Sequence, residues 1–316
     1  MEAVRRAVID VGTNSIKLLV ADVSGREVRP VHEESRQTRL GQGFYETRRL
    51  QPEAIAHTAA AVWEFAEIAR EKNAGSIRVI ATSAARDAVN PGDLTTAIQR
   101  AADLKVEIIS GEQEAEWVFQ GVNTDAELAR QPLLLLDVGG GSTEFIFGHG
   151  ARQHFAHSFP LGTVRLLEQF PHSNPPPRAE FTACRDWVKD FLRQEVRPRL
   201  EPALRRAAKP GFAAGRIQLV GTGGTTSILA RIEKKMDRFD RERIESTILS
   251  RERVTAWRRQ LWGLPLARRK EITGLPKLRA DVILTGVVIY EAVMEEFDFN
   301  QLRVSTRGLR FAAVMD

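Results

Sequence analysis

The chain has 316 residues and a mass of 35.4 kDa, with 43% hydrophobic and 28% charged residues, a composition typical of a soluble globular protein of about two domains. No apolar run approaches the roughly 20 residues that span a bilayer, and the N-terminus does not resemble a signal peptide. The single cysteine, Cys184, excludes a disulfide framework and a cysteine metal cluster. We therefore expect a cytoplasmic α/β protein.

The net charge of +5 is unevenly distributed along the chain. Residues 1–125 hold 15 Lys/Arg against 19 Asp/Glu, whereas residues 126–316 hold 31 against 22. The basic excess is densest at 185–216 and 231–259. This asymmetry indicates an anionic partner for the second half, although exposed helices rich in arginine would produce the same pattern.

In the first half, strands alternate with helices, which is the pattern of a sheet covered by helices. Apolar runs flank the turn Gly12–Ser15, and residues 51–72 repeat apolar side chains at helical spacing. The predicted elements are strands at 7–11 and 16–23, a helix at 51–72, a strand at 77–81, a helix at 92–102, a strand at 106–109 and a helix that opens near Glu112.

The second half begins with another apolar strand and repeats the same alternation. A proline-rich loop at 173–178 precedes a long basic helical region, and the apolar surface at 282–293 fits either the core, which we favour, or a dimer interface. The predicted elements are strands at 133–137, 144–148 and 217–220, a helix after Gly224, an apolar helix at about 279–296, a strand at 301–304 and a helix after Gly308.

Two six-residue segments match in register. Asp10–Ser15 and Asp137–Ser142 share Asp, Val, Gly and Ser at equivalent positions, 127 residues apart, and apolar strands flank both. A domain-sized offset favours duplication of a whole domain over a short solenoid repeat.

Three glycine-rich turns are of a size that fits a phosphate group. Glycine lets the backbone approach a ligand, and the N–H groups of a tight turn form an anion-binding concavity. Asp10 and Asp137 end their strands beside the first two turns, where a carboxylate could hold Mg²⁺. The third turn, Gly221–Gly224, opens a helix but lacks the lysine of a Walker A motif and the spacing of a dinucleotide fingerprint. A plain glycine-rich hairpin is the alternative for each of the first two turns.

Other candidate residues are weaker when taken alone. Glu112 and Glu116 fit dipole partners in a first helical turn, and Arg86 follows a strand from which it could reach an anion. The six histidines show no metal-binding spacing, so we expect them to be structural or exposed. Cys184 fits a small core residue.

Taken in order, the motifs resemble the exopolyphosphatase/guanosine pentaphosphatase (Ppx/GppA) family of the actin–Hsp70–sugar-kinase superfamily. The resemblance covers nearly the whole chain, and SGEQEA before DVGGGSTE is its most specific part. The motifs are IDVGTNSIKLLV (9–20), ATSAARDAVN (81–90), IISGEQEAEWVFQGV (108–122), LLDVGGGSTEFIFG (135–148), FPLGTVRL (159–166), LVGTGGTTSILA (219–230) and LPKLRADVILTGVVI (275–289).

The resemblance implies an α/β fold of two actin-like (ribonuclease H-like) domains, with the active site in the cleft between them. The expected domains are 1–125 and 126–304, with a terminal helix at about 305–316 that could pack back on the first. The chain resembles the short, two-domain form of the family.

The resemblance also assigns roles to residues. Glu114 matches the catalytic glutamate, although the acid expected before it is replaced by Gln113, and Arg86 matches the family arginine. The acids that the resemblance associates with Mg²⁺, or another divalent cation, are Asp10, Asp137 and Glu144. The implied phosphate-binding residues are Gly12, Thr13, Asn14, Ser15, Gly139, Gly140, Gly141, Ser142 and Thr143, to which the third turn adds Gly223 and Gly224.

The expected reaction is hydrolysis of a terminal phosphate by a water that Glu114 orients and deprotonates. The basic half could track a long polyanion, which favours inorganic polyphosphate over guanosine pentaphosphate. A superfamily kinase and a non-catalytic sensor of guanosine phosphates or polyphosphate remain alternatives. We expect no membrane partner, nucleic acid is disfavoured, and a homodimer remains open.

Overall fold

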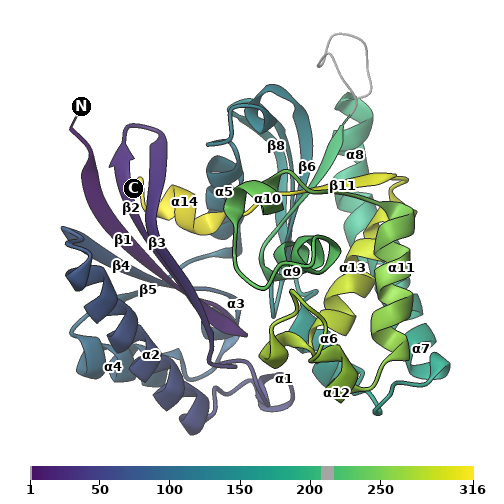
Figure 1. Cartoon of the computed structure of the whole chain (residues 1–316), viewed down its shortest axis with the longest axis horizontal. Coiled ribbons are helices and arrows are strands. Elements are labelled where there is room, and N and C mark those ends of the chain that lie inside the picture. Colours follow the sequence, from purple (N-terminus) through teal and green to yellow (C-terminus); the bar gives the residue numbers. More distant parts are fainter. Residues whose placement is uncertain (1, 208–216) are drawn as a thin grey trace. The chain divides into compact units, whose positions relative to one another are not determined.

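The computed structural model describes residues 2–207 and 217–316, and Figure 1 labels its elements. The chain divides into two compact units. The first comprises residues 1–125, 139–141 and 307–316, and the second comprises residues 126–138 and 142–306. Among the described helices, none combines the length and the apolar character needed to cross a membrane.

The first unit is built on a five-stranded sheet of order β3-β2-β1-β4-β5. Strand β1 (Val4–Val11) lies at its centre, antiparallel to β2 (Ser15–Ser24) and parallel to β4 (Ser76–Ala81). The last five residues of β1 are all buried, because helices cover both faces of the sheet. The edge strands are β3 (Glu27–Gln37) and β5 (Val106–Ile108).

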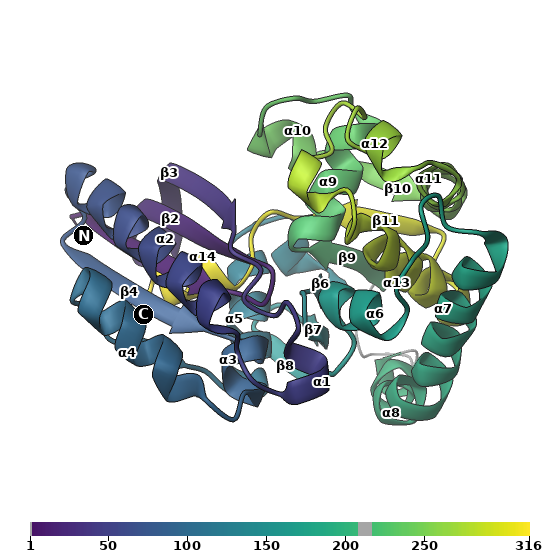
Figure 2. The same cartoon turned by 90° about the horizontal axis from the view of Figure 1, so that it is seen from below.

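Helices pack on both faces of this sheet (Figures 1 and 2). Helix α2 packs against β1 and β2 and beside α4, while α14 packs against α5 and β1. A Cβ on Gly121 of α5 would lie 2.1 Å from the carbonyl oxygen of Gly308, so only glycine permits this approach. The helices are α1 (Phe44–Thr47), α2 (Pro52–Glu71), α3 (Ser83–Asp87), α4 (Pro91–Ala102), α5 (Gly111–Val122) and α14 (Leu309–Ala313).

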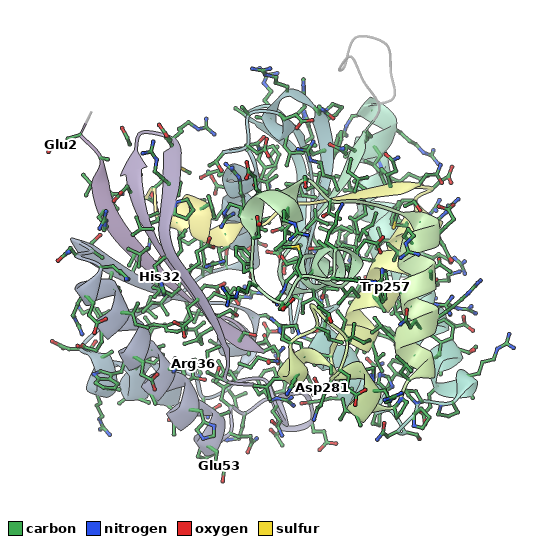
Figure 3. The ribbon with its side chains drawn as sticks, in the orientation of Figure 1. Glu2, His32, Arg36, Glu53, Trp257 and Asp281 are labelled. Carbon is green, nitrogen blue, oxygen red and sulfur yellow. The ribbon has the colours of Figure 1, made fainter. Side chains whose placement is uncertain are left out.

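Ion pairs hold the polar edge strand β3 of the first sheet in place. Arg36, labelled in Figure 3, forms ion pairs with Glu34 of its own strand and with Glu64 of α2. Its guanidinium lies 5.2 Å from the centroid of the buried Phe65 ring. The strand carries few apolar residues and is absent from the predicted elements, because its pairing with β2 and this clamp depend on contacts distant in sequence.

The second unit contains a six-stranded sheet of order β10-β11-β9-β6-β7-β8. Its central strand, β6, is antiparallel to β7 and parallel to β9, and β9 is parallel to β11. The strands are β6 (Pro132–Val138), β7 (Thr143–His149), β8 (Arg152–Phe159), β9 (Gln218–Thr222), β10 (Ile248–Ser250) and β11 (Gln301–Val304).

Helix α13 (Ile283–Glu296) forms the centre of the second core. Its first twelve residues are all buried, and it packs against α6, α7, α9 and α11. The apolar surface at 282–293 is therefore core, the interpretation favoured from the sequence. The other helices are η1 (Leu128–Arg130), α6 (Thr163–Gln169), α7 (Arg178–Phe191), η2 (Leu192–Val196), α8 (Arg197–Ala207), α9 (Gly224–Glu233), α10 (Arg241–Glu245), α11 (Arg251–Gly263), α12 (Leu266–Arg269) and η3 (Lys277–Arg279).

Polar side chains tie the surface helices of this unit to one another. Trp257 of α11, labelled in Figure 3, donates from Nε1 to Glu233 of α9 at 2.6 Å, and Arg253 binds the same carboxylate.

Cys184 is buried within α7, as predicted, and burial raises the pKa of its thiol to about 12.

The two sheets repeat one topology, which confirms the predicted duplication. Strands β1, β2, β3, β4 and β5 correspond in order and direction to β6, β7, β8, β9 and β11. The register is also repeated: Asp10 pairs with Lys17 across β1 and β2, and Asp137 pairs with Glu144 across β6 and β7. The addition of β10 at one edge distinguishes the second sheet.

Candidate active site

The turn after β1 is held by its own backbone and by the segment after β3. The N–H of Gly12 donates to the carbonyl of Ser15 at 3.1 Å, and the N–H of Gly41 donates to the carbonyl of Thr13 at 2.7 Å. Asp10, one residue before the end of β1, is buried, and its Oδ2 lies 3.9 Å from Nζ of Lys17. The first turn therefore carries a carboxylate whose charge an ammonium already offsets.

Asn14 and Ser15 of this turn are buried, yet Asn14 Nδ2 and Ser15 Oγ have no hydrogen-bond partner. Buried polar groups are nearly always hydrogen-bonded, so partnerless ones at a predicted ligand site are informative. Their predicted role, contact with phosphate oxygens, would supply the missing acceptors.

The glycine loop Gly139–Gly141 belongs to the first unit by its contacts. A Cβ on Gly140 would lie 2.8 Å from Thr13 Cβ, and a Cβ on Gly141 would lie 2.4 Å from Ser83 Oγ. Side chains are therefore excluded at Gly140 and Gly141 by the residues that these glycines cover.

Arg86 and Glu114 form an ion pair within the first unit. Arg86, at the end of α3, donates from Nη1 to Oε2 of Glu114 at 2.9 Å and to the carbonyl of Ile109 at 3.2 Å. Glu114 lies in the first turn of α5, where the Ser110 side chain caps the helix by accepting from the N–H of Gln113. At 8% exposure, Glu114 is the buried carboxylate of the SGEQEA motif, whereas Glu112 and Glu116 are exposed.

In the second unit, the turn after β9 lies against Asp137. Gly223 has a φ of 89°, and a Cβ there would lie 2.5 Å from Asp137 Oδ1. Only glycine tolerates both the positive φ and the approach. The sheet pairing also sets Asp137 beside Thr222, so the predicted carboxylate and the predicted third turn meet at the same end of the sheet.

Arg279 contacts this turn, although the sequence motifs assign it no role. A Cβ on Gly224 would lie 2.7 Å from Arg279 Nη2, so the guanidinium lies over the start of α9. Arg279 ends the short helix η3, and Asp281, labelled in Figure 3, accepts a hydrogen bond from the N–H of Val282 just beyond it. The motif LPKLRADVI contains this arginine, but nothing local in the sequence indicates which turn it covers.

Tyr290 of α13 is buried behind the same turn. Its hydroxyl donates toward the carbonyls of Leu136 and Thr222, at 3.3 Å and 3.2 Å, and so links β6 to β9. Burial, and secondly the negative charge of Asp137, raise the pKa of Tyr290 well above its usual value.

The remaining residues of the second predicted turn are buried. Thr143 is fully buried and its hydroxyl donates to the carbonyl of Leu161, while Ser142 is buried beside it. Glu144 is 1% exposed and accepts a hydrogen bond from Ser158 Oγ at 2.7 Å. In this structure Thr143 and Glu144 therefore hold strands β7 and β8 and the following loop together.

The acids expected at the metal site differ in their surroundings. Across residues 2–207 and 217–316, no group of three or more His, Cys, Asp or Glu side chains is arranged to hold a metal ion. Mg²⁺ is usually bound through one or two carboxylates with waters and substrate phosphates. The Asp137 carboxylate, whose Oδ1 lies against Gly223, fits that mode. Nζ of Lys17 lies 3.9 Å from Asp10, and Ser158 donates a hydrogen bond to Glu144.

The basic helices of the second unit are largely occupied by ion pairs. Arg193 and Arg197 bind Glu296, Arg199 binds Glu195, and Arg205 binds Glu201. Arg206 is exposed and forms no ion pair with any residue that the structure describes, and Lys209 lies outside the described residues. The predicted polyanion track therefore has fewer available cations than the sequence suggested.

The fold and these residues define a two-unit α/β protein of duplicated topology, in which the partly buried Arg86 is paired with the buried Glu114. The model of the Ppx/GppA phosphatase family matches residues 19–315. The chain is 36% identical over 325 residues to exopolyphosphatase 2 of Mycobacterium tuberculosis, an alignment that covers 98% of this chain and 97% of that protein.

Solved structures agree with this match. An exopolyphosphatase from Cytophaga hutchinsonii has a TM-score of 0.85 at 27% identity and covers 98% of this chain and 96% of its own. The Aquifex aeolicus member of the Ppx/GppA family has a TM-score of 0.77 at 28% identity, over 99% and 97% of the two chains. The chain therefore belongs to the Ppx/GppA phosphatase family. The expected actin-like α/β fold class and the expected enzyme class, a phosphoanhydride hydrolase, are confirmed.

Proposed function

We propose that the chain is an exopolyphosphatase that removes terminal phosphate from inorganic polyphosphate. The observation that carries the proposal is the Arg86–Glu114 ion pair, 2.9 Å long and inside the first unit, together with the similarity to exopolyphosphatase 2 along nearly the whole chain. A buried carboxylate beside a guanidinium is suited to phosphoryl transfer to water, because one partner can accept a proton while the other offsets phosphate charge.

Each residue would have a distinct part in this reaction. Glu114 orients the attacking water and accepts its proton, while Arg86 fixes the carboxylate and contacts the phosphate oxygens. The N–H groups of Gly12–Ser15 and the side chains of Asn14 and Ser15 bind the phosphate chain. Asp137 would hold Mg²⁺, which would neutralise charge on the phosphates when bound.

Guanosine pentaphosphate is the second candidate substrate, and one observation favours it. The ion pairs of Arg193, Arg197, Arg199 and Arg205 remove part of the reason to expect a long polyanion. A compact nucleotide needs fewer cations distant from the cleaved bond. A sensor that binds either ligand without hydrolysis is the alternative of another class.

The test is phosphate release with Mg²⁺ from long-chain polyphosphate, from guanosine pentaphosphate and from ATP with sugars. We expect release from polyphosphate and none from ATP with sugars. Release from guanosine pentaphosphate alone would replace the proposed substrate with the nucleotide. Binding of either ligand without release would support the sensor.

The first predicted variant is Glu114→Gln. We expect it to retain polyphosphate binding and to lose turnover by at least about 10²-fold, a typical contribution of a general base. The matched control is Glu116→Gln, because Glu116 is exposed on the same helix and contacts Gln113 and Gln120. Near-normal turnover in Glu114→Gln would rule out the assigned base.

A further inference from the structure

Four buried side-chain polar atoms of the first unit lack a hydrogen-bond partner and gather at one turn. They are Asn14 Nδ2, Ser15 Oγ, Thr38 Oγ1 and Ser83 Oγ. Ser83 is 3% exposed and Thr38 is 6% exposed, so water does not readily satisfy them. An unsatisfied buried polar group destabilises the fold, so a cluster of four is informative.

The backbone places Ser83 and Thr38 on either side of the Gly12–Ser15 turn. Ser15 pairs with Gln37, the residue before Thr38, and the N–H of Arg39 donates to the carbonyl of Asn14 at 3.1 Å. On the other side, the N–H of Thr82 donates to the carbonyl of Val11 at 3.2 Å, and Ser83 follows directly. The cluster is thus set by main-chain hydrogen bonds within one unit.

The glycine loop adds a second, independent feature. A Cβ on Gly141 would lie 2.4 Å from Ser83 Oγ, 2.6 Å from the Tyr45 hydroxyl and 3.0 Å from Thr13 Oγ1. Three hydroxyls therefore surround a position from which any side chain is excluded. The backbone of Gly141 therefore packs directly on these hydroxyls, which holds the glycine loop beside Ser83 and the Gly12–Ser15 turn.

The chemistry of the cluster selects the class of that group. The amide nitrogen of Asn14 can only donate a hydrogen bond. The hydroxyls of Ser15, Thr38 and Ser83 can each donate one. A partner that accepts from all four atoms must supply several oxygens close together, as a phosphate group does. A metal cation could be held by the hydroxyl oxygens but would leave the Asn14 amide nitrogen, which has no lone pair to offer, without a partner.

We propose that Ser83 and Thr38 bind a phosphate group of the substrate at the Gly12–Ser15 turn. The inference rests on the proposed function only for the identity of the ligand. Ser83 would add a hydroxyl on the β4 side of the turn and Thr38 one on the β3 side, so each contacts the phosphate chain without taking part in proton transfer.

The proposal predicts opposite effects on stability and on binding, which a structural hydroxyl would not produce. In Ser83→Ala and Thr38→Val, an unsatisfied group is removed, so the melting temperature without ligand should stay constant or rise. KM for polyphosphate should increase by about 10-fold or more in each variant, as expected when a hydrogen bond to a charged group is lost, with kcat changed much less.

The matched control is Thr58→Val. Thr58 is a buried threonine of the same unit, but its hydroxyl donates to the carbonyl of Ala54 at 2.7 Å, away from the turn. We expect this variant to melt at a lower temperature and to keep its KM. Polyphosphate of one defined chain length should also raise the melting temperature less in Ser83→Ala and Thr38→Val than in Thr58→Val. This thermal shift is measured in the Glu114→Gln background, so that the ligand is not consumed.

The outcomes separate this inference from the proposed function. If wild type hydrolyses polyphosphate, while Ser83→Ala and Thr38→Val melt lower and keep the wild-type KM and thermal shift, the hydroxyls are structural and the inference is wrong. If wild type releases phosphate from neither polyphosphate nor guanosine pentaphosphate, the proposed function is wrong. The thermal shift of wild type and the two variants with inorganic phosphate would then decide the inference by itself.

Discussion

Asp10 and Asp137 occupy equivalent positions in the two sheets, but their neighbours make them chemically different. The residue paired with Asp10 is Lys17, whose ammonium lies 3.9 Å from the carboxylate, whereas the residue paired with Asp137 is Glu144. Duplication therefore produced one carboxylate opposite a lysine and one opposite a second acid. The lysine opposite Asp10 is consistent with the proposal that Asp137, rather than both aspartates, binds the divalent cation.

His172 provides a prediction at the residue scale. Its ring packs on Trp262 at 4.5 Å, and neither ring nitrogen has a hydrogen-bond partner. Burial, opposed by Glu180 and reinforced by Arg269, lowers the pKa of His172 to about 4 from 6.5. The unfolded chain binds the proton more readily, so the stability that depends on neutral His172 is complete above about pH 6.5 and is lost as the pH falls toward 4.

The measurement compares melting temperatures of wild type and His172→Phe from about pH 7 to about pH 4. Because phenylalanine keeps the ring without the charge, wild type should lose stability relative to the variant through this range. His57→Gln is the control, since His57 is exposed on α2. If the difference in melting temperature between wild type and His172→Phe stays constant with pH, the proposed effect of burial on the pKa of His172 is contradicted.

At the scale of elements, helix α5 connects the candidate base to the C-terminal helix of the first unit. Glu114 lies in its first turn, and Gly121 in its last turn contacts the backbone of Gly308 ahead of α14. Arg310 of α14 also donates to the carbonyl of Leu18 in β2 at 2.7 Å. The position of Glu114 therefore depends on packing between segments that are far apart in the sequence.

Gly121→Ala tests this packing. The added Cβ would meet the Gly308 carbonyl oxygen at 2.1 Å, so we expect a loss of about 1–3 kcal/mol in the free energy of unfolding, together with reduced turnover as α5 shifts. Gly92→Ala in α4 is the control, because no heavy atom lies within 4 Å of the added Cβ. Denaturant unfolding measures both, and equal stability of the two variants would refute the close contact.

At the scale of the whole molecule, the charge asymmetry has a different meaning from the one that the sequence alone indicates. The second half carries the basic excess, but many of its arginines bind acids of the same unit. An arginine held by a carboxylate contributes less to attraction of a distant polyanion than an unpaired one. The number of basic residues counted along the chain therefore overestimates how many unpaired cations a ligand meets, although the net basic excess of this half is unchanged by the pairing.

This leads to a prediction about salt and charge. Arg199→Gln should leave KM for polyphosphate within about twofold of wild type at low ionic strength, and surface pairs of this kind stabilise by only about 0–1 kcal/mol. KM for polyphosphate is compared with that of Arg206→Gln, since Arg206 is exposed and forms no ion pair with the residues that the structure describes. A severalfold rise of KM in Arg199→Gln, with a weaker dependence on salt, would indicate that the paired helices do track the polyanion.

Much of the fold could be predicted, because hydrophobic periodicity and glycine turns are local signals. The predicted bounds of strand β11 match the observed ones, and those of α4 and β4 agree within one residue. Strand β3 escapes prediction because its residues are polar and its place depends on Arg36 and β2. Helix α13 starts at Ile283 rather than near Arg279, since the residues after Pro276 form the separate short helix η3 instead.

The sequence by itself determined the two-fold repeat, most of the strands, the glycine turns and the identity of Glu114 and Arg86 as candidates, because short motifs and periodic burial are encoded within a few residues of one another. Only the tertiary structure decided that Arg86 meets Glu114, that Arg279 covers Gly224, that Ser83 and Thr38 flank the first turn, and that the basic helices are paired with acids. Most of these contacts join residues that are distant in sequence, and chain folding rather than local propensity brings such residues together.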